Sequence, residues 1–419
     1  MAKQIDYRKQ IVLPTLFGVE AATVKELEQL DLPEGETVVT DGQVSFIPKE
    51  EKEISILAAR CNYNCRTPER VLIGLASFDA DNFDALYDFT RELPWEDWLD
   101  RDYAITVTGY SLKSKLYGVP SMQSIIKKAI VDRLTQARKL IPGSHIVEDK
   151  NKGELNIRFA AVKDKISFSL DTSGEGLHKR GYRPLTHMAP IRETLAAAIL
   201  DYLFFLRNQK QGEILFDPVC GSGTFLIEGA MMLSGLAPGL MRHFSGENLG
   251  LAGAKAFKQE RDYAESKRKQ ISGKDKVFFG SDLSAQSIED AKSNARRAGV
   301  EGLIDFKQAD LMQISYEDIV ALSPRALVVA NPPYGERMAS PDESSIINRA
   351  LGMLVIDKLT GMNKKGLRLG VITADSDFEE EVGFKADKRR KLYNGMIPCQ
   401  LYQYFRTSAR ERLESEVRS

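Results

Sequence analysis

Cysteine is scarce in this sequence of 419 residues, and long apolar runs are absent. The four cysteines are scattered, and the two nearest, Cys61 and Cys65, are separated by three residues instead of the two that are typical of a zinc ribbon. We therefore expect neither a disulfide framework nor a metal site. No stretch of about 18 apolar residues is present, and the start MAKQIDYRKQ lacks a secretory apolar segment, so we expect a cytoplasmic protein without a membrane partner.

A strong net charge is also absent. The formal net charge is −1, with 43% hydrophobic and 28% charged residues, which is typical of globular proteins and excludes a uniformly basic surface for nonspecific nucleic-acid binding. Any contact with nucleic acid has to come from local basic patches, such as the one that contains Lys127 and Lys128. A chain of this length is expected to form two or three domains.

The pattern of apolar residues changes near the middle of the chain. Residues 1–165 combine short strands with helices, and residues 121–140 predict an amphipathic helix with a basic outer face. Residues 174–190 are rich in Gly, Pro and basic residues and indicate a connector. Helices and strands then alternate, which predicts an α/β fold with a parallel, doubly wound sheet and a final antiparallel hairpin at its edge.

The first chemical motif is a strand, a glycine turn and a helix in EILFDPVCGSGTFLIEG. In a doubly wound sheet this turn lies at the carboxyl end of the strand, where ligands bind. A phosphate-binding P-loop needs a lysine that is absent here, and a dinucleotide fingerprint needs a third glycine where the sequence has Leu226. Asp217 with Gly221 and Gly223 remains, as in class I enzymes that use S-adenosylmethionine.

Two further carboxylates follow predicted strands. Asp282 ends VFFGSD, where it can accept hydrogen bonds from both ribose hydroxyls of an adenosine cofactor. Asp310 ends FKQAD and is positioned to meet the adenine amino group. The stretch of about residues 236–272 between the glycine turn and Asp282 is interpreted as an insertion.

The deciding motif is NPPY at residues 331–334, which follows the apolar strand ALVVA. Two prolines cannot continue a sheet, so they shape a stiff loop. If the Asn331 side-chain oxygen and the Pro332 carbonyl accept both hydrogens of an exocyclic base amine, the nitrogen lone pair can point at a methyl sulfonium. Tyr334 can stack on the base, which has to be flipped out of any paired stem.

These motifs, with LDTSGEGLHKRGYRPLTHMAPIRETLAAAIL before them, resemble the THUMP-domain RNA methyltransferases, and most of all the bacterial 23S ribosomal RNA guanine-N2 methyltransferases. The resemblance is strong over residues 171–405 and looser over the first 165. It implies a class I, Rossmann-like methyltransferase domain behind an α+β region that binds RNA. The implied parts are a ferredoxin-like part at 1–65, a THUMP domain at 66–168, a linker at 169–190, the methyltransferase domain at 191–407 and a polar tail at 408–419.

The resemblance also assigns residues to roles. Catalysis falls to Asn331, Pro332, Pro333 and Tyr334. S-adenosyl-L-methionine would be held by Asp217, Pro218, Gly221, Gly223, Asp282, Asp310 and Asn331. Contacts with RNA are predicted for Lys127, Lys128, Arg180, Tyr182 and Arg183.

Several alternatives stay open. The same acceptors suit guanine N2 and adenine N6, and the substrate can be ribosomal or transfer RNA. Some bacterial relatives carry a second methyltransferase domain, whereas this sequence ends at Ser419, which weakens the choice of a ribosomal target. DNA as substrate is disfavoured by the implied RNA-binding module. A noncatalytic RNA-binding assembly factor is the alternative of another class, and the intact motifs argue against it.

Overall fold

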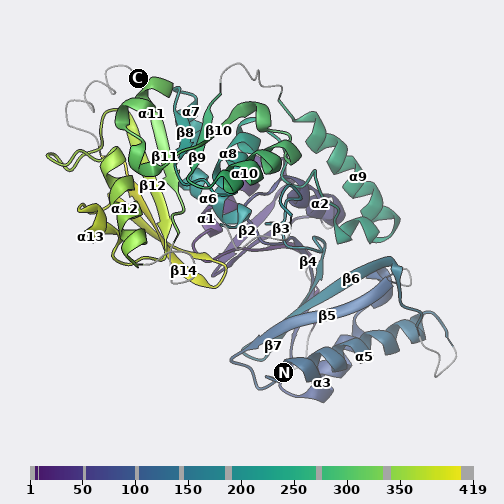
Figure 1. The fold of residues 1–419 in the computed structure, drawn as a ribbon. Coiled ribbons are helices and arrows are strands. Elements are labelled where there is room, and N and C mark those ends of the chain that lie inside the picture. Colours follow the sequence, from purple (N-terminus) through teal and green to yellow (C-terminus); the bar gives the residue numbers. More distant parts are fainter. Residues whose placement is uncertain are drawn as a thin grey trace. The chain divides into compact units, whose positions relative to one another are not determined.

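The computed structural model describes residues 5–7, 9–50, 53–99, 103–140, 146–184, 191–269, 276–333 and 341–406. The chain divides into two compact units, and a seven-stranded sheet lies in each (Figure 1). Unit 1 comprises Met1–Thr15, Thr23–Leu177 and Arg242–Ser266, and unit 2 comprises Leu16–Ala22, His178–Met241 and Lys267–Ser419. The chain therefore passes between the units more than once, so neither unit is one continuous stretch of sequence.

The first part of unit 1 has the ferredoxin-like order of elements. These are β1 (Gln10–Pro14), α1 (Glu20–Gln29), β2 (Gly35–Thr40), β3 (Gln43–Pro48), α2 (Ile54–Asn64) and β4 (Leu72–Asp79). The strands are antiparallel neighbours in the order β2-β3-β1-β4. β1 lies between β3 and β4 and its apolar side chains are buried, whereas β2 is an exposed edge strand.

The second part of unit 1 extends the same sheet. Its elements are α3 (Phe83–Glu92), α4 (Trp95–Trp98), β5 (Tyr103–Leu112), α5 (Val119–Ala137), β6 (Asp149–Val162) and β7 (Lys165–Asp171). β7 pairs with β6 on one side and with β4 on the other. Because β4 also pairs with β1, the structure shows one continuous sheet across the predicted boundary at residues 65 and 66, and β4 completes the ferredoxin-like part.

The insertion predicted between the glycine turn and Asp282 is partly helical. It contains η2 (Ser245–Asn248) and α9 (Gly250–Ser266), which belong to unit 1. The Arg60 guanidinium of α2 donates to both carboxylate oxygens of Glu260 on α9, at 3.0 and 2.9 Å. Residues 242–266, which lie within the predicted methyltransferase domain at 191–407, therefore belong to compact unit 1.

Unit 2 contains the predicted doubly wound sheet, with strand order β10-β9-β8-β11-β12-β14-β13. Its strands are β8 (Ile214–Asp217), β9 (Phe278–Asp282), β10 (Ile304–Gln308), β11 (Ala326–Ala330), β12 (Leu367–Thr373), β13 (Lys388–Asn394) and β14 (Ile397–Tyr404). The first five are parallel, and β13 and β14 form the antiparallel hairpin that the sequence predicts.

Helices connect these strands. They are α6 (Glu193–Tyr202), α7 (Phe205–Gln209), α8 (Thr224–Leu233), α10 (Ala285–Arg297), η3 (Glu301–Leu303), η4 (Leu311–Gln313), α11 (Tyr316–Leu322), α12 (Pro341–Val355) and α13 (Phe378–Val382). α6 and α7 are separate helices, because Phe204 between them has a left-handed backbone with φ of 54°.

The core of unit 2 lies on both faces of its sheet. In β11 all five residues are buried; Leu327 and Val329 belong to one apolar cluster, and Val328 and Ala330 belong to the other. A parallel strand that is covered on both faces needs such a continuous apolar sequence. The strand therefore fixes the position of the NPP residues that follow it.

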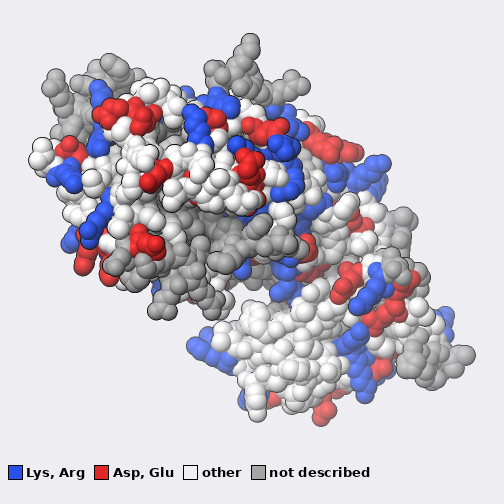
Figure 2. Space-filling model, in the orientation of Figure 1, with Lys and Arg blue, Asp and Glu red and all other residues white. Residues whose placement is uncertain are grey.

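The visible surface carries both signs of charge. Basic and acidic residues are interspersed on the face shown in Figure 2, as the net charge of −1 suggests. In the described part of the chain, no helix has the length and apolarity that crossing a membrane requires.

Candidate active site

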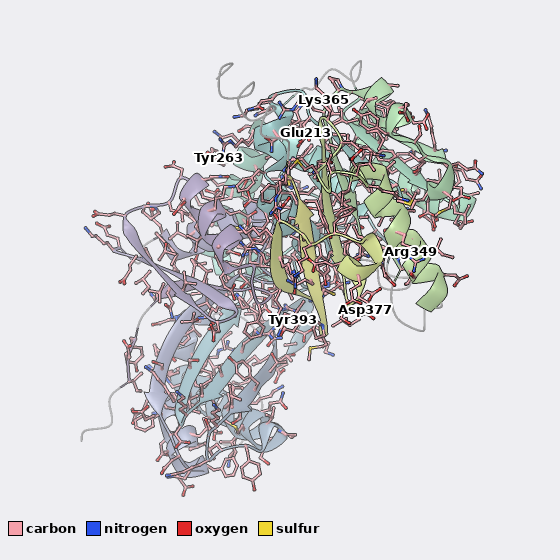
Figure 3. All side chains as sticks on the ribbon, turned by 90° about the vertical axis from the view of Figure 1, so that its left-hand side faces the viewer. Glu213, Tyr263, Arg349, Lys365, Asp377 and Tyr393 are labelled. Carbon is pink, nitrogen blue, oxygen red and sulfur yellow. The ribbon has the colours of Figure 1, made fainter. Side chains whose placement is uncertain are left out.

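The polar residues singled out in unit 2 lie at the carboxyl edge of its parallel strands. Asp217 ends β8, Asp282 ends β9, and Asn331 follows β11 directly. The strand order reverses between β8 and β11, which is where a doubly wound sheet forms its ligand crevice. In Figure 3 Asp377, which follows β12, marks this carboxyl edge. Glu213 and Lys365, which precede β8 and β12, mark the opposite, amino edge. The topology therefore brings the predicted cofactor and catalytic residues to one edge of one sheet.

The glycine turn after β8 is tied to the next strand by its backbone. The Cys220 N–H donates to the Ser281 carbonyl at 2.8 Å, and the Gly221 N–H donates to Oδ2 of Asp282 at 2.9 Å. The Ser281 hydroxyl also donates to the carbonyl of Pro218 at 3.3 Å. These bonds hold the turn in a fixed position beside the end of β9.

Gly221 and Gly223 serve different purposes. Both have a positive φ, which favours glycine. A Cβ on Gly223 would come within 3.2 Å of Ala291 and Phe306, so this glycine allows close packing. A Cβ on Gly221 would meet no atom within 4 Å, so the backbone here faces open space that a cofactor can approach.

The Asp217 carboxyl is buried beneath the turn. Its Oδ1 accepts a hydrogen bond from the Val219 N–H at 3.1 Å. Burial raises the pKa of Asp217 well above its ordinary value; the bond from Val219 opposes this rise and the nearby Asp282 carboxylate adds to it. A cationic group of a bound ligand would stabilise the ionised form, which suits a cofactor that carries positive charge. Burial also raises the pKa of the Cys220 thiol, which disfavours its nucleophilic thiolate form.

The other two carboxylates also organise backbone. Asp282 accepts from Gly221 with Oδ2 and from the Ser284 N–H with Oδ1 at 2.9 Å, and its remaining lone pairs are available to ribose hydroxyls. Asp310 caps η4 by accepting from the Met312 N–H at 2.9 Å. It also lines a hollow of about 390 Å³ beside the ends of β9 and β10.

The residues after β11 present an unused acceptor. Oδ1 of Asn331 is buried and has no hydrogen-bond partner among the described residues. Pro332 is buried, and the Pro333 carbonyl accepts from the Ser344 hydroxyl of α12 at 2.8 Å. Tyr334 lies outside the described residues. Leaving a buried oxygen unpaired costs about 1–3 kcal/mol, so this acceptor can gain a hydrogen bond from a donor that enters the site.

Comparison with known proteins agrees with this geometry. Residues 180–403 match the family described as the RMKL-like methyltransferase domain. Residues 10–72 match an RlmL ferredoxin-like domain, and residues 80–171 match a THUMP domain. The chain belongs to the RMKL-like, THUMP-domain RNA methyltransferases. This membership confirms the predicted family and fold class.

Two curated relatives of this RMKL-like protein illustrate the match. A protein of Bacillus subtilis (strain 168) named "Putative RNA methyltransferase YpsC" is 34% identical over 401 residues, which cover 96% of this chain and 97% of that protein. The ribosomal RNA large subunit methyltransferase K/L of Allochromatium vinosum is 33% identical over 351 residues, which cover 81% of this chain and 45% of that protein. The chain thus aligns with about half of the longer relative.

A solved structure supports the cofactor assignment. The crystal structure of SMU.472, which contains S-adenosylhomocysteine, is 31% identical and has a TM-score of 0.82, with 96% of this chain and 100% of that chain covered. S-adenosylhomocysteine is what remains after S-adenosylmethionine loses its methyl group. The cofactor of this RMKL-like methyltransferase is S-adenosylmethionine, and the open backbone at Gly221 fits it.

Two predicted RNA contacts of this methyltransferase are wrong. Arg180 is 2% exposed and lies 3.4 Å from the buried Glu228 carboxylate, and the Tyr182 hydroxyl donates to the same carboxylate at 3.3 Å. Arg183 is mostly buried, and it pairs with Glu193 at 2.8 Å and donates to the Thr224 hydroxyl at 3.3 Å. Because Thr224 begins α8, this segment supports the helix behind the glycine turn, and Arg180 and Tyr182 offer no surface to RNA.

The sequence did not lead us to predict that Glu228 and Glu193 form buried ion pairs with Arg180 and Arg183. Glu228 stands in the otherwise apolar helix TFLIEGAMML, and a single charge at a buried position indicates a buried counter-charge. That signal points to a partner without identifying it, because Arg180 lies 48 residues away in the sequence.

Lys127 and Lys128 lie on α5 in the THUMP part. Lys127 forms an ion pair with Glu148 at 2.9 Å, and Lys128 is exposed with its ammonium 5.6 Å from the centre of the Tyr87 ring. Their contact with RNA remains a prediction.

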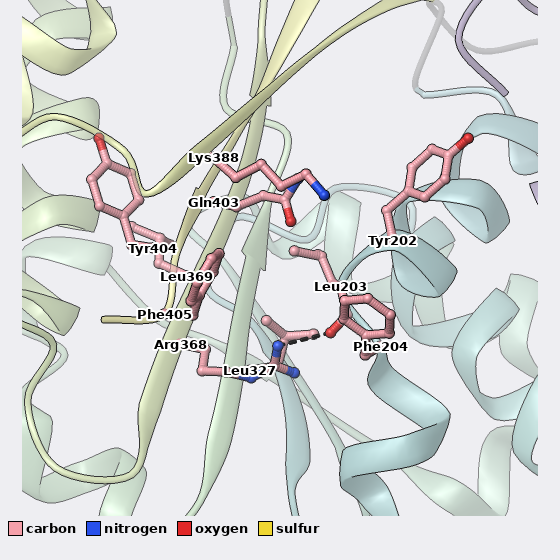
Figure 4. Close-up of a pocket in the computed structure, with 10 residues that line it drawn as sticks. All are labelled: Tyr202, Leu203, Phe204, Leu327, Arg368, Leu369, Lys388, Gln403, Tyr404 and Phe405. Carbon is pink, nitrogen blue, oxygen red and sulfur yellow. Dashed lines mark hydrogen bonds between the residues drawn. The ribbon is translucent and has the colours of Figure 1, made fainter. Parts of the chain in front are cut away.

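A second cavity of unit 2 lies away from the cofactor edge. It has a volume of about 230 Å³ and lies at the amino edge of the parallel strands, where Arg368 is the second residue of β12 (Figure 4). The Arg368 guanidinium donates to the Leu203 carbonyl at 2.8 Å and pairs with Glu213 at 2.6 Å. This cavity is therefore separate from the residues that handle the cofactor.

Proposed function

We propose that this enzyme methylates the exocyclic N2 of a guanine in large-subunit ribosomal RNA, by direct transfer from S-adenosylmethionine and in the cytoplasm. The observation that carries the proposal is the buried and unpaired Oδ1 of Asn331 at the carboxyl end of β11. It supplies a hydrogen-bond acceptor at the strand next to the one that ends in the glycine turn.

The chemistry follows from the weakness of the nucleophile. An exocyclic amine delocalises its lone pair into the base, so the nitrogen has to pyramidalise before it can attack. Asn331 Oδ1 accepts one amine hydrogen and the Pro332 carbonyl accepts the other, which stabilises the positive charge that develops on nitrogen. The cofactor supplies a methyl group on a positively charged sulfur. The nitrogen lone pair forms the new N–C bond, the electrons of the S–C bond stay on sulfur, and the amine then loses a proton to water.

The remaining residues of the edge hold the reactants. Asp282 accepts from the ribose hydroxyls, Asp310 meets the adenine amino group, and Gly221 with Pro218 lets the backbone approach the cofactor. The Pro333 carbonyl accepts a hydrogen bond from the Ser344 hydroxyl, which ties Pro333 to α12. Tyr334 stacks on the target base. No covalent enzyme intermediate is required.

The choice of RNA rests on the relatives. The name of the Allochromatium vinosum protein specifies large-subunit ribosomal RNA, and the match to a THUMP domain favours RNA as the substrate. Adenine N6 presents an amine to the same acceptors, and transfer RNA stays the alternative molecule.

The deciding experiment is mass-spectrometric mapping of modified nucleosides in ribosomal and transfer RNA from cells with and without the gene. We expect one N2-methylguanine of large-subunit ribosomal RNA to disappear without the gene and to return when it is supplied again. Loss of a nucleoside from transfer RNA, or loss of N6-methyladenine, would replace the proposed substrate with that one.

A second measurement separates an enzyme from a noncatalytic assembly factor. Calorimetry of the purified chain with S-adenosylmethionine should show binding to one site. Absence of binding would favour a factor that has kept only the fold.

A further inference from the structure

The β13–β14 hairpin ends in a group of exposed apolar residues. Met396 is 94% exposed and Ile397 is 49% exposed at the turn, and Phe17, 55% exposed, lies edge-on to Tyr393 with ring centroids 6.0 Å apart. We name Phe17, Tyr393, Met396 and Ile397 the hairpin tip. Single exposed apolar residues are common, but a cluster at the end of a projecting hairpin indicates a contact surface.

The hairpin tip lies at the active-site edge of the sheet. Ala330 at the end of β11 is paired with Val371 of the neighbouring strand β12, and Val371 is paired in turn with Tyr402 of β14. From Tyr402 the strand runs back to Ile397 at the turn, a rise of roughly 17 Å at about 3.3 Å per residue. In Figure 3 Tyr393 and Asp377 both lie toward this end of the sheet, opposite Glu213 and Lys365. The tip therefore projects beyond the level at which Asn331 receives the target amine.

The lateral distance is also short. β14 is the second strand from β11 in the sheet order, which corresponds to roughly 10 Å at about 4.8 Å per strand. A nucleotide whose base reaches Asn331 thus has its neighbours in the chain within reach of the hairpin tip.

The hairpin is held rigidly. Asn394 and Ile397 are paired across a two-residue turn whose first residue, Gly395, has a φ of 67°. The Asn394 side-chain oxygen accepts from the Arg192 N–H at 3.4 Å. On its other side, the Gly18 carbonyl accepts from the Tyr202 hydroxyl at 2.6 Å, which fixes the segment that carries Phe17. Because the backbone of the turn is already fixed, placing Met396 in a base stack requires no further ordering of the main chain.

One exposed cation lies beside the hairpin tip. Lys391 is exposed on β13, and its ammonium lies 5.6 Å from the centre of the Tyr393 ring. Lys388 and Arg389 lie toward the other end of the strand, where they are paired with Gln403 and Tyr402. Apolar side chains beside an exposed cation suit a ligand that presents stacked bases between phosphates.

We infer that the hairpin tip inserts Met396 into the base stack next to the target nucleotide of a structured RNA, and so helps to expel the target base into the cleft. This inference rests on the proposed transfer to an RNA base. Apolar wedges between base steps repay part of the unstacking energy, which is a few kcal/mol per step. The role is one of substrate positioning, because Met396 touches none of the reacting atoms.

The test compares transfer of a labelled methyl group to two forms of one RNA. The full-length protein acts on total RNA from a strain that lacks the gene, either refolded with Mg²⁺ or fragmented and heat-denatured. Met396→Ala should lower kcat/KM on the folded RNA by about tenfold or more, and on the denatured RNA it should stay within about twofold of the wild type. Met396→Leu should restore activity on the folded RNA, because leucine keeps the apolar wedge.

A matched control is available in Leu359, which is 95% exposed in the loop after α12. Leu359→Ala should leave both activities unchanged. The inference is overturned if Met396→Ala keeps the full kcat/KM on the folded RNA. It is also overturned if the variant loses kcat/KM by the same factor on the folded and the denatured RNA. If the wild type methylates neither form, the proposed function itself fails, and this result is distinct from a defect of the variant alone.

Discussion

The Gly221 backbone N–H donates a hydrogen bond to Oδ2 of Asp282 across 2.9 Å. These two residues were expected to touch different parts of the cofactor, yet they also hold each other. The carboxylate that we propose to bind the ribose thus also fixes the shape of the glycine turn, so a substitution at either residue should affect the other.

We therefore expect Asp282→Asn to impair both binding and stability. The carboxylate accepts from Gly221 and from Ser284 with different oxygens, whereas an amide offers only one oxygen and turns an N–H group toward the other donor. The loss should be about 1–3 kcal/mol in the free energy of unfolding, and affinity for S-adenosylmethionine should fall by about tenfold or more. Urea denaturation and calorimetry measure the two effects. Glu289→Gln, at an exposed position of α10, is the control and should change neither; a normal affinity in Asp282→Asn would contradict the assigned role.

Asn331→Ala should separate catalysis from cofactor binding. Removing a single preorganised acceptor costs about 10²–10³ in kcat in well-studied active sites, and we expect a loss of that size. Affinity for S-adenosylmethionine should change by about twofold or less, because the role we propose for this acceptor is to bind the target amine. Single-turnover transfer and calorimetry on the same preparation check both points. Unchanged turnover would show that the unpaired Oδ1 has another partner.

The positions of the chemical residues could be predicted because they follow buried strands. Parallel strands all end at the same edge, so Asp217, Asp282 and Asn331 meet there even though the sequence separates them widely. The unpaired state of Asn331 Oδ1 could not be predicted, since it depends on the absence of neighbours in three dimensions.

Basic residues in the connector misled the sequence analysis for a physical reason. HKRGYR has the composition of an exposed RNA-binding loop, but Glu228 on α8 supplies a buried counter-charge that neutralises Arg180. The assignment of α9 to unit 1 was also beyond prediction. Its partner is α2, about 200 residues earlier in the chain, and the sequence contains no local sign of this long-range contact.

Asp217→Asn should change how stability depends on pH. Burial raises the pKa of Asp217 in the folded chain, so the unfolded chain releases its proton first as the pH rises. The wild type therefore loses stability with rising pH between the unfolded and the folded pKa, by at most about 1.4 kcal/mol per pH unit. The variant has no such proton, and without cofactor its stability relative to the wild type should increase from about pH 5 to pH 8. Urea midpoints across this range test the slope; a constant difference would mean that the Asp217 carboxyl ionises normally.

Substitution of Arg180 should lower the stability of the protein, whereas substitution of Lys128 should lower its affinity for RNA. Arg180→Ala leaves the Glu228 carboxylate buried without its counter-charge and should cost about 3–5 kcal/mol, whereas the pair Arg180→Met with Glu228→Leu should recover much of this loss. Lys128→Ala should leave the free energy of unfolding within about 0.5 kcal/mol of the wild type and weaken RNA binding with a smaller salt dependence. Urea denaturation and RNA titration at several salt concentrations distinguish the two. The opposite result would be a folded Arg180→Ala variant that binds RNA weakly and a Lys128→Ala variant that binds RNA normally. It would mean that Arg180, and not Lys128, contacts RNA.

The pairing of Arg60 with Glu260 gives a direct test of how the inserted helix folds. Glu260 is 1% exposed and accepts two hydrogen bonds from Arg60, so Glu260→Ala leaves a guanidinium without its partner between α2 and α9. We expect a loss of about 2 kcal/mol or more, which should appear as faster amide hydrogen exchange in residues 54–64 and 250–266. The amides of α10 should keep their protection, because α10 belongs to unit 2. Glu265→Ala is the control, since its pair with Arg261 lies on the exposed side of the same helix and such pairs contribute about 1 kcal/mol or less. If exchange in Glu260→Ala instead increases in α10 and remains slow in α2, the insertion folds with the methyltransferase unit and the division of the chain into these two units is wrong.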